Sequence, residues 1–304
     1  MKCIFLYNPA LYKLKKNLSY ITQKLNARFE YVEVKEIISE EKMREEVSIS
    51  CKKADVICFG GGDGTFNLVV NEVLKNETRP ILAYIPSGTA NDIASNLKIS
   101  KNVKKAVKVI CEGSPIYHDV GKVNSNYFVY ICGAGTFTGV SYSTKKAYKK
   151  IFGIAAYALT GVKELNRPTI VSGKATLDGK CLDITCPIVL VANSCFIGGR
   201  KFNRRGHKND GKFDVILCKK QFTNIFSIAK LVIFGTYKKD HTKYYDFYRA
   251  SNISFTPSND IVWCLDGEKG PSGEISITNI PNQIQIFVSN KGEENENNSR
   301  KASK

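Results

Sequence analysis

Apolar residues in the first 120 positions follow two spacings. Short apolar-rich runs that fit β-strands lie at residues 3–7, 31–34, 56–59 and 81–85. The runs at 56–59 and 81–85 contain no charged residue, which is typical of parallel strands buried on both faces. After the third run, apolar residues recur at helical spacing, at Phe66, Val69, Val70, Val73 and Leu74. Further helices are predicted after residue 88 and over residues 101–113. This repetition predicts a doubly wound, Rossmann-like α/β domain.

The pattern changes near residue 118. Short runs of β-branched and aromatic residues then alternate with turn residues, and Asp178-Gly179 is a strong signal for a two-residue hairpin. We therefore expect an α/β domain over residues 1–118 and a mostly antiparallel, β-rich domain over residues 119–284. Outside this pattern lie two predicted helical insertions and a tail expected to be disordered, at residues 144–166, 222–237 and 291–304.

Positive charge is concentrated in the second half of the chain. The formal net charge is +17, and residues 141–250 hold 21 Lys and Arg against 7 Asp and Glu. The clusters lie at 145–150, 200–208, 219–220 and 238–239. Such an excess favours an anionic partner, namely nucleic acid, an acidic membrane surface or a phosphorylated ligand. Any one cluster alone is also typical of an ordinary solvated surface.

Composition argues against several classes of protein. A hydrophobic content of 43% is typical of soluble globular proteins. No run reaches the roughly 20 apolar residues needed to span a bilayer, and the N-terminus lacks a signal-peptide pattern. The ten cysteines are scattered without a CxxC pair, which indicates buried thiols in a reducing cytosol. The three histidines have no zinc-site spacing with cysteine.

The stretch FGGGDGTFN at residues 59–67 falls where a buried strand ends and a helix begins. Glycines let backbone N–H groups approach a ligand, and a helix N-terminus favours an anion, so phosphate is the expected ligand. No Lys-Ser/Thr follows as in a Walker A loop. Asp63 would repel phosphate unless a cation intervenes, which favours a Mg²⁺ network. The alternative is an Asp that makes local turn hydrogen bonds.

Two further polar loops follow predicted strands on the same edge of the sheet. Residues 86–97 read PSGTANDIASNL, in which Thr89 and Asn91 can donate to phosphate, and Asn8-Pro9 follows the first strand. Each residue type alone is an ordinary turn or helix cap. Three such loops at the carboxyl ends of three strands predict a binding site.

Four motifs in this order resemble those of the diacylglycerol kinase catalytic-domain family, and most closely its soluble bacterial lipid kinases. They are GGDGTFN (61–67), PSGTANDIA (86–94), NDGKFDV (209–215) and WCLDGE (263–268). GGDGT is also similar to NAD kinases and phosphofructokinases, whereas PSGTAND together with LDGE indicates the lipid kinases. The resemblance implies a nucleotide domain, a β-sandwich-like domain, and an active site between them. It also implies a return of the chain to the first domain near residues 285–290.

The resemblance assigns roles to individual residues. ATP would contact Asn8, Gly61, Gly62, Asp63, Gly64, Thr65, Phe66, Asn67, Thr89 and Asn91. Glu268 would be the general base that takes the proton from a lipid hydroxyl, with Asp266 beside it. An attacking hydroxyl does need a proton acceptor within hydrogen-bond reach. Without the resemblance, Asp-Gly-Glu after a strand is typical of a surface hairpin.

The resemblance also implies a structural Mg²⁺ at the NDG stretch. Its ligands would be the Asp210 carboxylate and the backbone carbonyls of His207 and Lys212. Oxygen ligands of this kind suit Mg²⁺. One departure from the family pattern concerns the first loop, where NPALYK replaces Asn-Pro-x-Ser-Gly and removes part of the expected ATP contact.

The sequence therefore predicts an ATP- and Mg²⁺-dependent kinase that converts diacylglycerol to phosphatidic acid. We expect a cytoplasmic protein that associates peripherally with the inner face of an anionic membrane through its basic second domain. The alternatives are other lipid acceptors (a sphingoid base, a monoacylglycerol or a polyprenol) and a catalytically silent relative. A basic nucleic-acid-binding protein is disfavoured, because no RNP-type, KH or helix-turn-helix pattern occurs. The sequence leaves a homodimer open.

Overall fold

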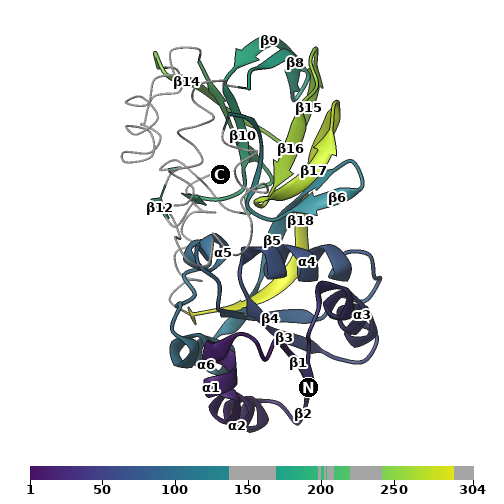
Figure 1. Ribbon diagram of the computed structural model, residues 1–304, viewed down its shortest axis with the longest axis vertical. Coiled ribbons are helices and arrows are strands. Elements are labelled where there is room, and N and C mark those ends of the chain that lie inside the picture. The colour runs from purple at the N-terminus through teal and green to yellow at the C-terminus, as the bar shows by residue number, and fades with distance from the viewer. Residues whose placement is uncertain (137–168, 198–199, 202, 204–208, 220–241, 291–304) are drawn as a thin grey trace. The chain divides into compact units, whose positions relative to one another are not determined.

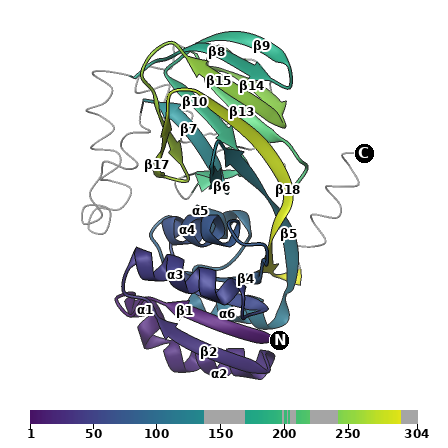
Figure 2. The ribbon, with the colours of Figure 1, turned by 90° about the vertical axis from the view of Figure 1, so that its right-hand side faces the viewer.

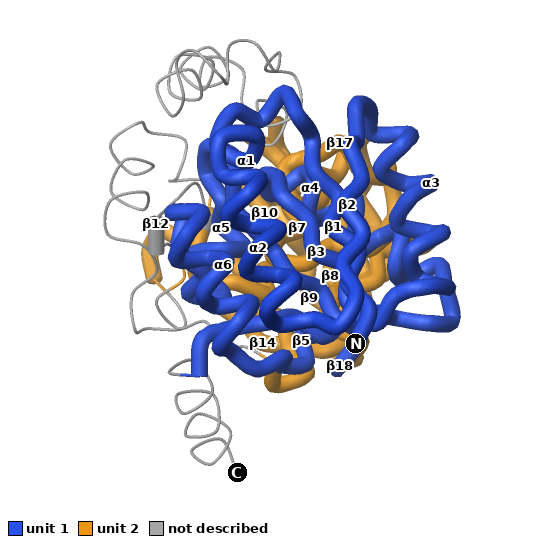
Figure 3. The backbone as a smooth tube through the Cα atoms, turned by 90° about the horizontal axis from the view of Figure 1, so that it is seen from below, with its two compact units in different colours: residues 1–119, 282–304 blue, residues 120–281 orange. Residues whose placement is uncertain are grey.

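The computed structural model of the chain describes residues 1–136, 169–197, 200–201, 203, 209–219 and 242–290 (Figure 1). These residues form two units. Unit 1 comprises Met1–Asp119 and Asn282–Lys304, and unit 2 comprises Val120–Pro281 (Figure 3). The predicted helical insertions, the predicted disordered tail and His207 lie outside the described residues, as do most of the basic clusters.

Unit 1 is built on a parallel sheet with the strand order β2-β1-β3-β4-β18. These strands are β1 (Lys2–Tyr7), β2 (Tyr31–Glu36), β3 (Val56–Gly61), β4 (Ile81–Pro86) and β18 (Ile275–Val288). Every residue of β3 is buried, as the uninterrupted apolar run predicted. The strands expected near 3–7, 31–34, 56–59 and 81–85 are confirmed. Only the last residues of β18 belong to this unit.

Helices cover both faces of this sheet. They are α1 (Tyr12–Lys16), α2 (Leu18–Arg28), α3 (Glu40–Cys51), α4 (Asp63–Val73), α5 (Asp92–Asn96) and α6 (Val103–Glu112). Helices α2 and α6 lie together on one face, and α3 and α4 on the other (Figure 2). In α6, the apolar stripe Val103, Ala106, Val107 and Ile110 is buried. The Asn102 side chain caps this helix by accepting a hydrogen bond from the Lys105 N–H. The doubly wound α/β architecture is thereby confirmed.

Unit 2 contains two antiparallel sheets that share one core. The first comprises the start of β18, then β15 (Asn252–Pro257), β8 (Val171–Leu177) and β9 (Lys180–Cys186). Strand β5 (Ser114–Val123) pairs with β18 and with β6 (Asn126–Phe128), and only its residues from Val120 onward belong to unit 2. The second has the order β14 (Tyr245–Ala250), β13 (Phe213–Cys218), β10 (Ile188–Ala192), β7 (Ile131–Gly135), β16 (Val262–Leu265) and β17 (Glu268–Ser272). Two short strands, β11 (Phe196–Ile197) and β12 (Arg200–Lys201), pair antiparallel with each other.

Side chains from both sheets of unit 2 form one apolar core, which makes it a β-sandwich-like unit. Trp263 is fully buried there against Phe255, with ring centroids 5.0 Å apart, and its indole N–H donates to the Gly273 carbonyl. The predicted Asp178-Gly179 hairpin is confirmed between β8 and β9. Both residues have positive φ, +46° and +87°, as a type I′ turn requires.

The cysteines behave as small apolar residues. Eight of the ten are buried and all ten are free thiols, and burial raises the pKa of Cys3 to about 12. Among the described helices, none is both long and apolar enough to cross a bilayer.

Candidate functional site

The strand order of unit 1 brings three polar loops to one edge of the sheet. After β1 the chain continues to β2 on one side of the sheet, and after β3 it continues to β4 on the opposite side. The loops that follow β1 and β3 therefore flank a topological switch point. Ligands of open α/β sheets bind outside the carboxyl ends of the strands at such a point. Asn8 follows β1, Gly62 and Asp63 follow β3, and Ser87 follows β4. The predicted loops therefore lie where a ligand of such a sheet is expected.

The Asp63 carboxylate joins two of these loops. Asp63 is the first residue of α4, and its Oδ1 accepts a hydrogen bond of 3.0 Å from the Ile93 N–H in the first turn of α5. The cap residue of α5, Asn91, makes no side-chain cap of its own, so Asp63 supplies it from another segment. Burial, and then the nearby Asp63 charge, raise the pKa of the Tyr84 phenol well above its usual value.

The side chain of Asn91 is used inside its own loop. It has a positive φ of +52° and is 1% exposed. Its Oδ1 accepts from the Gly88 N–H at 3.0 Å and from the Tyr84 hydroxyl at 3.3 Å, while its Nδ2 donates to the Gly88 carbonyl at 2.7 Å. Asn91 thus shapes the loop that presents Thr89, whose side chain is exposed.

The loops after β3 and β4 are in backbone contact. Ser87 N–H donates to the Gly61 carbonyl at 2.7 Å. A Cβ on Gly88 would stand 2.5 Å from the Gly62 Cα, closer than real Cβ contacts allow. A Cβ on Gly60 or Gly61 would meet the side chain of Leu14 or Thr65. The glycines in FGGGDGT therefore let protein segments approach each other, a role that the sequence interpretation, based on a ligand, did not include.

The remaining residues predicted to contact a nucleotide differ in their burial and in their hydrogen bonds. The Phe66 side chain is fully buried between Phe59 and Tyr84, and its N–H bonds to Gly62, so it has a packing role. Asn8 Oδ1 accepts from the Ala10 N–H at 2.8 Å, which closes the turn into α1. The N-terminal turn of α4, with Gly62, Asp63, Gly64 and Thr65, is partly exposed. That turn supplies the N–H groups and positive dipole end suited to a phosphate.

The acidic motif of unit 2 forms a two-residue hairpin between β16 and β17. Asp266 and Gly267 have φ angles of +51° and +88°, and Leu265 pairs with Glu268 across the turn. The hairpin suggested by residue type is therefore present. Its two acids have opposite surroundings, since Glu268 is exposed and Asp266 is 2% exposed.

Buried Asp266 is held by backbone donors from β7 and the residues just before it. Its Oδ2 accepts from the Val129 N–H at 2.6 Å, and its Oδ1 accepts from the N–H groups of Tyr130 and Ile131, both at 2.9 Å. Its own N–H donates to the Ile131 carbonyl at 2.8 Å. Charge-assisted bonds of this kind are strong, so they fix the turn that carries Glu268.

The NDG stretch of unit 2 contains an ion pair that no sequence motif indicates. Asp210 Oδ1 accepts from the Lys212 N–H at 3.2 Å, and Asp210 Oδ2 pairs with the guanidinium of Arg249. Arg249 Nε also lies 3.3 Å from Asp214 Oδ1. Arg249 belongs to no motif, and only the strand pairing places it here. Among the described residues, no group of three or more His, Cys, Asp or Glu is arranged to hold a metal.

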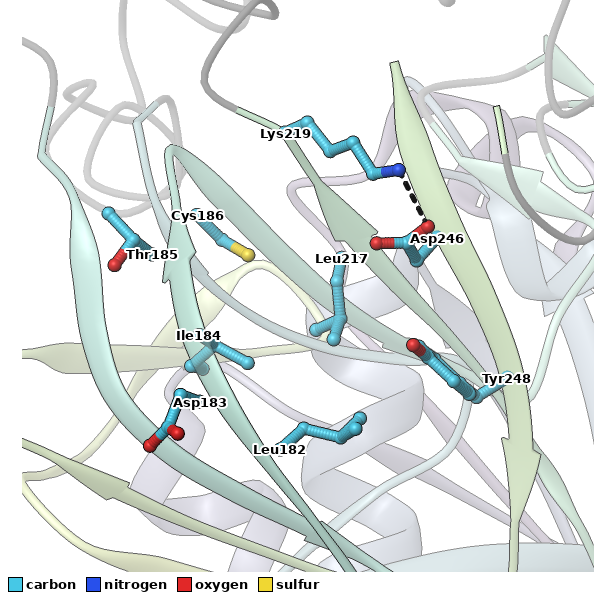
Figure 4. A pocket seen from close by; sticks show the side chains of 9 residues that line it. All are labelled: Leu182, Asp183, Ile184, Thr185, Cys186, Leu217, Lys219, Asp246 and Tyr248. Atoms are coloured by element: carbon cyan, nitrogen blue, oxygen red, sulfur yellow. Dashed lines mark ion pairs between the residues drawn. The ribbon is translucent and has the colours of Figure 1, made fainter. Parts of the chain in front are cut away.

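Unit 2 also has a pocket of about 230 Å³ that no sequence motif marks (Figure 4). Its lining comes from β9, the end of β13, and β14: Leu182, Asp183, Ile184, Thr185, Cys186, Leu217, Lys219, Asp246 and Tyr248. Lys219 Nζ and Asp246 Oδ1 pair at 2.8 Å at one side, and leucine and isoleucine side chains line another part.

Comparison with known proteins links both units to one family. Residues 2–123 match the family model described as the diacylglycerol kinase catalytic domain. Residues 133–288 match the model described as the YegS C-terminal NAD kinase beta sandwich-like domain. A Staphylococcus aureus (strain NCTC 8325 / PS 47) protein named diacylglycerol kinase is 32% identical over 242 residues, which is 78% of this chain and 75% of that protein.

A second relative and two solved structures agree. A diacylglycerol kinase of Staphylococcus saprophyticus is 30% identical over 239 residues, covering 78% of this chain and 77% of its own. A crystal structure from Bacillus anthracis str. Sterne has a TM-score of 0.83 at 24% identity and covers 95% of this chain and 98% of that chain. Another, described as a diacylglycerol kinase, has a TM-score of 0.77 at 21% identity, with 95% and 97% covered. The two structures establish a shared fold.

Proposed function

The chain belongs to the diacylglycerol kinase family, in its bacterial branch, and we propose that it transfers the γ-phosphate of ATP to the hydroxyl of diacylglycerol. The products are phosphatidic acid and ADP. Membership makes the protein a lipid kinase and implies ATP as the phosphate donor. The observation that best supports a working enzyme is the LDGE hairpin, where an exposed Glu268 stands two residues after an anchored, buried Asp266.

The ATP phosphates would lie at the N-terminal turn of α4. The partly exposed backbone of residues 62–65 faces them, and Asn8 and Thr89 flank the position from the neighbouring loops. Asp63 suits a Mg²⁺ network, because a carboxylate has about four lone-pair sites and Mg²⁺ usually keeps several waters. The hydrogen bond from Ile93 therefore fits a water-mediated link from the same carboxylate to the metal. Bound Mg²⁺ would neutralise charge on the transferred phosphoryl group.

Glu268 would act on the acceptor side. The lipid hydroxyl forms the new O–P bond, its proton passes to the Glu268 carboxylate, and the bond to the ADP oxygen breaks. A general base must reach the substrate, which agrees with the exposure of Glu268. Asp266 is a positioning residue in this proposal, because its carboxylate is engaged with backbone N–H groups.

We further propose that the protein works at the inner face of an anionic membrane from the cytoplasm. The net charge of +17 and the basic bias of residues 141–250 support this location. Each basic residue near such a surface contributes about 1 kcal/mol of attraction. Diacylglycerol is buried in a bilayer, so a kinase that lacks contact with the surface would not reach it.

The proposal is tested by phosphate transfer from radiolabelled ATP to lipids in mixed micelles. The panel contains diacylglycerol, a monoacylglycerol, a sphingoid base and a polyprenol, and diacylglycerol should be labelled fastest. Glu268→Gln should lower the rate by about 100-fold or more while the unfolding midpoint stays unchanged. Lys269→Gln, at the neighbouring exposed position, is the matched control and should retain the rate.

Three outcomes would contradict parts of this proposal. A Glu268→Gln variant as fast as wild type would remove the general-base assignment. Faster labelling of another lipid would change the acceptor but keep the kinase. No labelled lipid, together with retention of RNA at physiological salt, would replace the kinase with a nucleic-acid-binding protein.

A further inference from the structure

Arg249 faces two carboxylates at the edge of the second sheet of unit 2. Strand pairing sets Arg249 on β14 directly opposite Asp214 on β13. The guanidinium pairs with Asp210 Oδ2, and its Nε lies 3.3 Å from Asp214 Oδ1. The Arg249 side chain is 33% exposed, against 17% for Asp210 and 2% for Asp214. The single Arg249 guanidinium therefore compensates the charge of two carboxylates, the half-buried Asp210 and the buried Asp214.

Other contacts hold both carboxylates in this arrangement. Asp214 Oδ2 accepts a hydrogen bond from Asn203 Nδ2 at 2.5 Å. The NDG turn has Asn209 and Gly211 at positive φ, +52° and +73°. The Gly211 carbonyl accepts from the Ser251 hydroxyl at 2.7 Å, two residues after Arg249. The turn is thus joined to the end of β14 at two points.

This arrangement disagrees with a structural Mg²⁺ on Asp210. Such an ion would need a carboxylate oxygen of Asp210 as an anionic ligand within an octahedral set of oxygens. One oxygen accepts from Lys212 N–H and the other is paired with the positively charged guanidinium of Arg249. A divalent ion here would stand beside that positive charge, and the two would repel each other.

We propose that Arg249 is the permanent cation of the NDG turn, so that unit 2 needs no Mg²⁺ at Asp210. The charge that the family resemblance assigns to a metal is supplied by a side chain of β14. A planar guanidinium can reach two carboxylates at once, which an ammonium group does less well. The Mg²⁺ that accompanies ATP is a separate requirement, which this proposal leaves unchanged. The proposal does not depend on which lipid is phosphorylated.

The test is thermal unfolding of the full chain without nucleotide, in millimolar Mg²⁺ and in EDTA. The wild-type midpoint should be the same in both. Arg249→Gln should lower it by at least about 5 °C, since buried Asp214 loses its cation, and Arg249→Lys should recover part of this loss. Lys219→Gln is the matched control, because it removes the more exposed pair with Asp246 and should cost less.

Two results would overturn the proposal. The first is a wild-type midpoint that rises with Mg²⁺ and no longer does so in Asp210→Asn, which would place a metal on Asp210. The second is an Arg249→Gln variant as stable as wild type. Neither result bears on phosphate transfer, because the measurement contains no ATP or lipid. The proposal on Arg249 can therefore be wrong while the proposed kinase activity is right, and the kinase activity can be wrong while the proposal on Arg249 is right.

Discussion

The Asp63 carboxylate accepts the backbone N–H of Ile93 at 3.0 Å, across thirty positions of sequence. It caps α5 in addition to any role in a Mg²⁺ network, and a suitable pair of variants separates these two functions. Asp63→Asn keeps an oxygen that can accept the Ile93 N–H but removes the charge. Asp63→Ala removes both.

We expect Asp63→Asn to keep wild-type stability and to lose phosphate transfer, because a neutral amide binds a Mg²⁺ network poorly. Asp63→Ala should in addition lose about 0.5–2 kcal/mol of stability, the usual cost of a lost helix cap. Denaturant unfolding and the transfer assay measure the two effects. A fully active Asp63→Asn variant would leave the carboxylate with a structural role alone.

Gly62 and Gly88 lie against each other where the loop after β3 meets the loop after β4. An alanine Cβ at position 88 would stand 2.5 Å from the Gly62 Cα, whereas a Cβ at position 62 would stand 3.1 Å from the Gly88 Cα. Backbone atoms cannot move aside as a side chain can, so Gly88→Ala should cost about 1–3 kcal/mol. Gly62→Ala, the milder change, should cost less. Denaturant unfolding measures both losses of stability. If Gly62→Ala and Gly88→Ala lose the same stability, the two loops separate easily.

The sheet of unit 1 was predictable because its strands are buried on both faces. The runs at 56–59 and 81–85 have no polar interruption, and this follows directly from helices covering each side. Helix α3 was not predicted, because its buried face includes Glu46 and Ser50, which hide the apolar stripe. Strand β18 runs from Ile275 to Val288 and contains Asn282 at a φ of +58°, and a strand of this length was not predicted from the sequence.

Sequence motifs located the candidate site, but the partners of its residues could not be read from them. Asp63 bonds to Ile93, and Asp266 to residues 129–131, across separations of 30 to 137 positions. A motif shows residue types at fixed spacing and carries no information on such distant contacts. Arg249 shows the same limit, because only the pairing of β13 with β14 brings it to the NDG turn.

The two acids of the LDGE hairpin should respond differently to amide substitution. Asp266→Asn places an amide NH₂ against backbone N–H donors that now bond to a carboxylate. We expect a loss of about 1.5–3 kcal/mol of stability and a lower kcat, because the turn that carries Glu268 is loosened. Lipid KM should change little. If Asp266→Asn is as stable as wild type yet inactive, Asp266 acts on the substrate and not through the turn.

Glu46 gives unit 1 a stability that depends on pH. Its side chain is 10% exposed and lies 2.6 Å from Lys35 Nζ and 3.2 Å from Lys42 Nζ. The hydrogen bond from Lys35, followed by that from Lys42, holds the pKa of Glu46 below its usual value, although burial opposes this. A lowered pKa in the folded state contributes stability above the unfolded pKa, and this stability is lost as the pH falls through the folded pKa.

Glu46→Gln should therefore cost about 1 kcal/mol near neutral pH. The cost should shrink as the pH falls from the usual glutamate pKa through the lowered pKa of folded Glu46, because the wild-type side chain then becomes protonated as well. Glu45→Gln is the control, because Glu45 is 57% exposed and, within the described part of the chain, pairs with Lys42 alone, so its cost should be small at every pH. Denaturant unfolding of the three proteins at several pH values measures the difference. A cost for Glu46→Gln that stays constant down to acidic pH would mean that packing, and not charge, accounts for it.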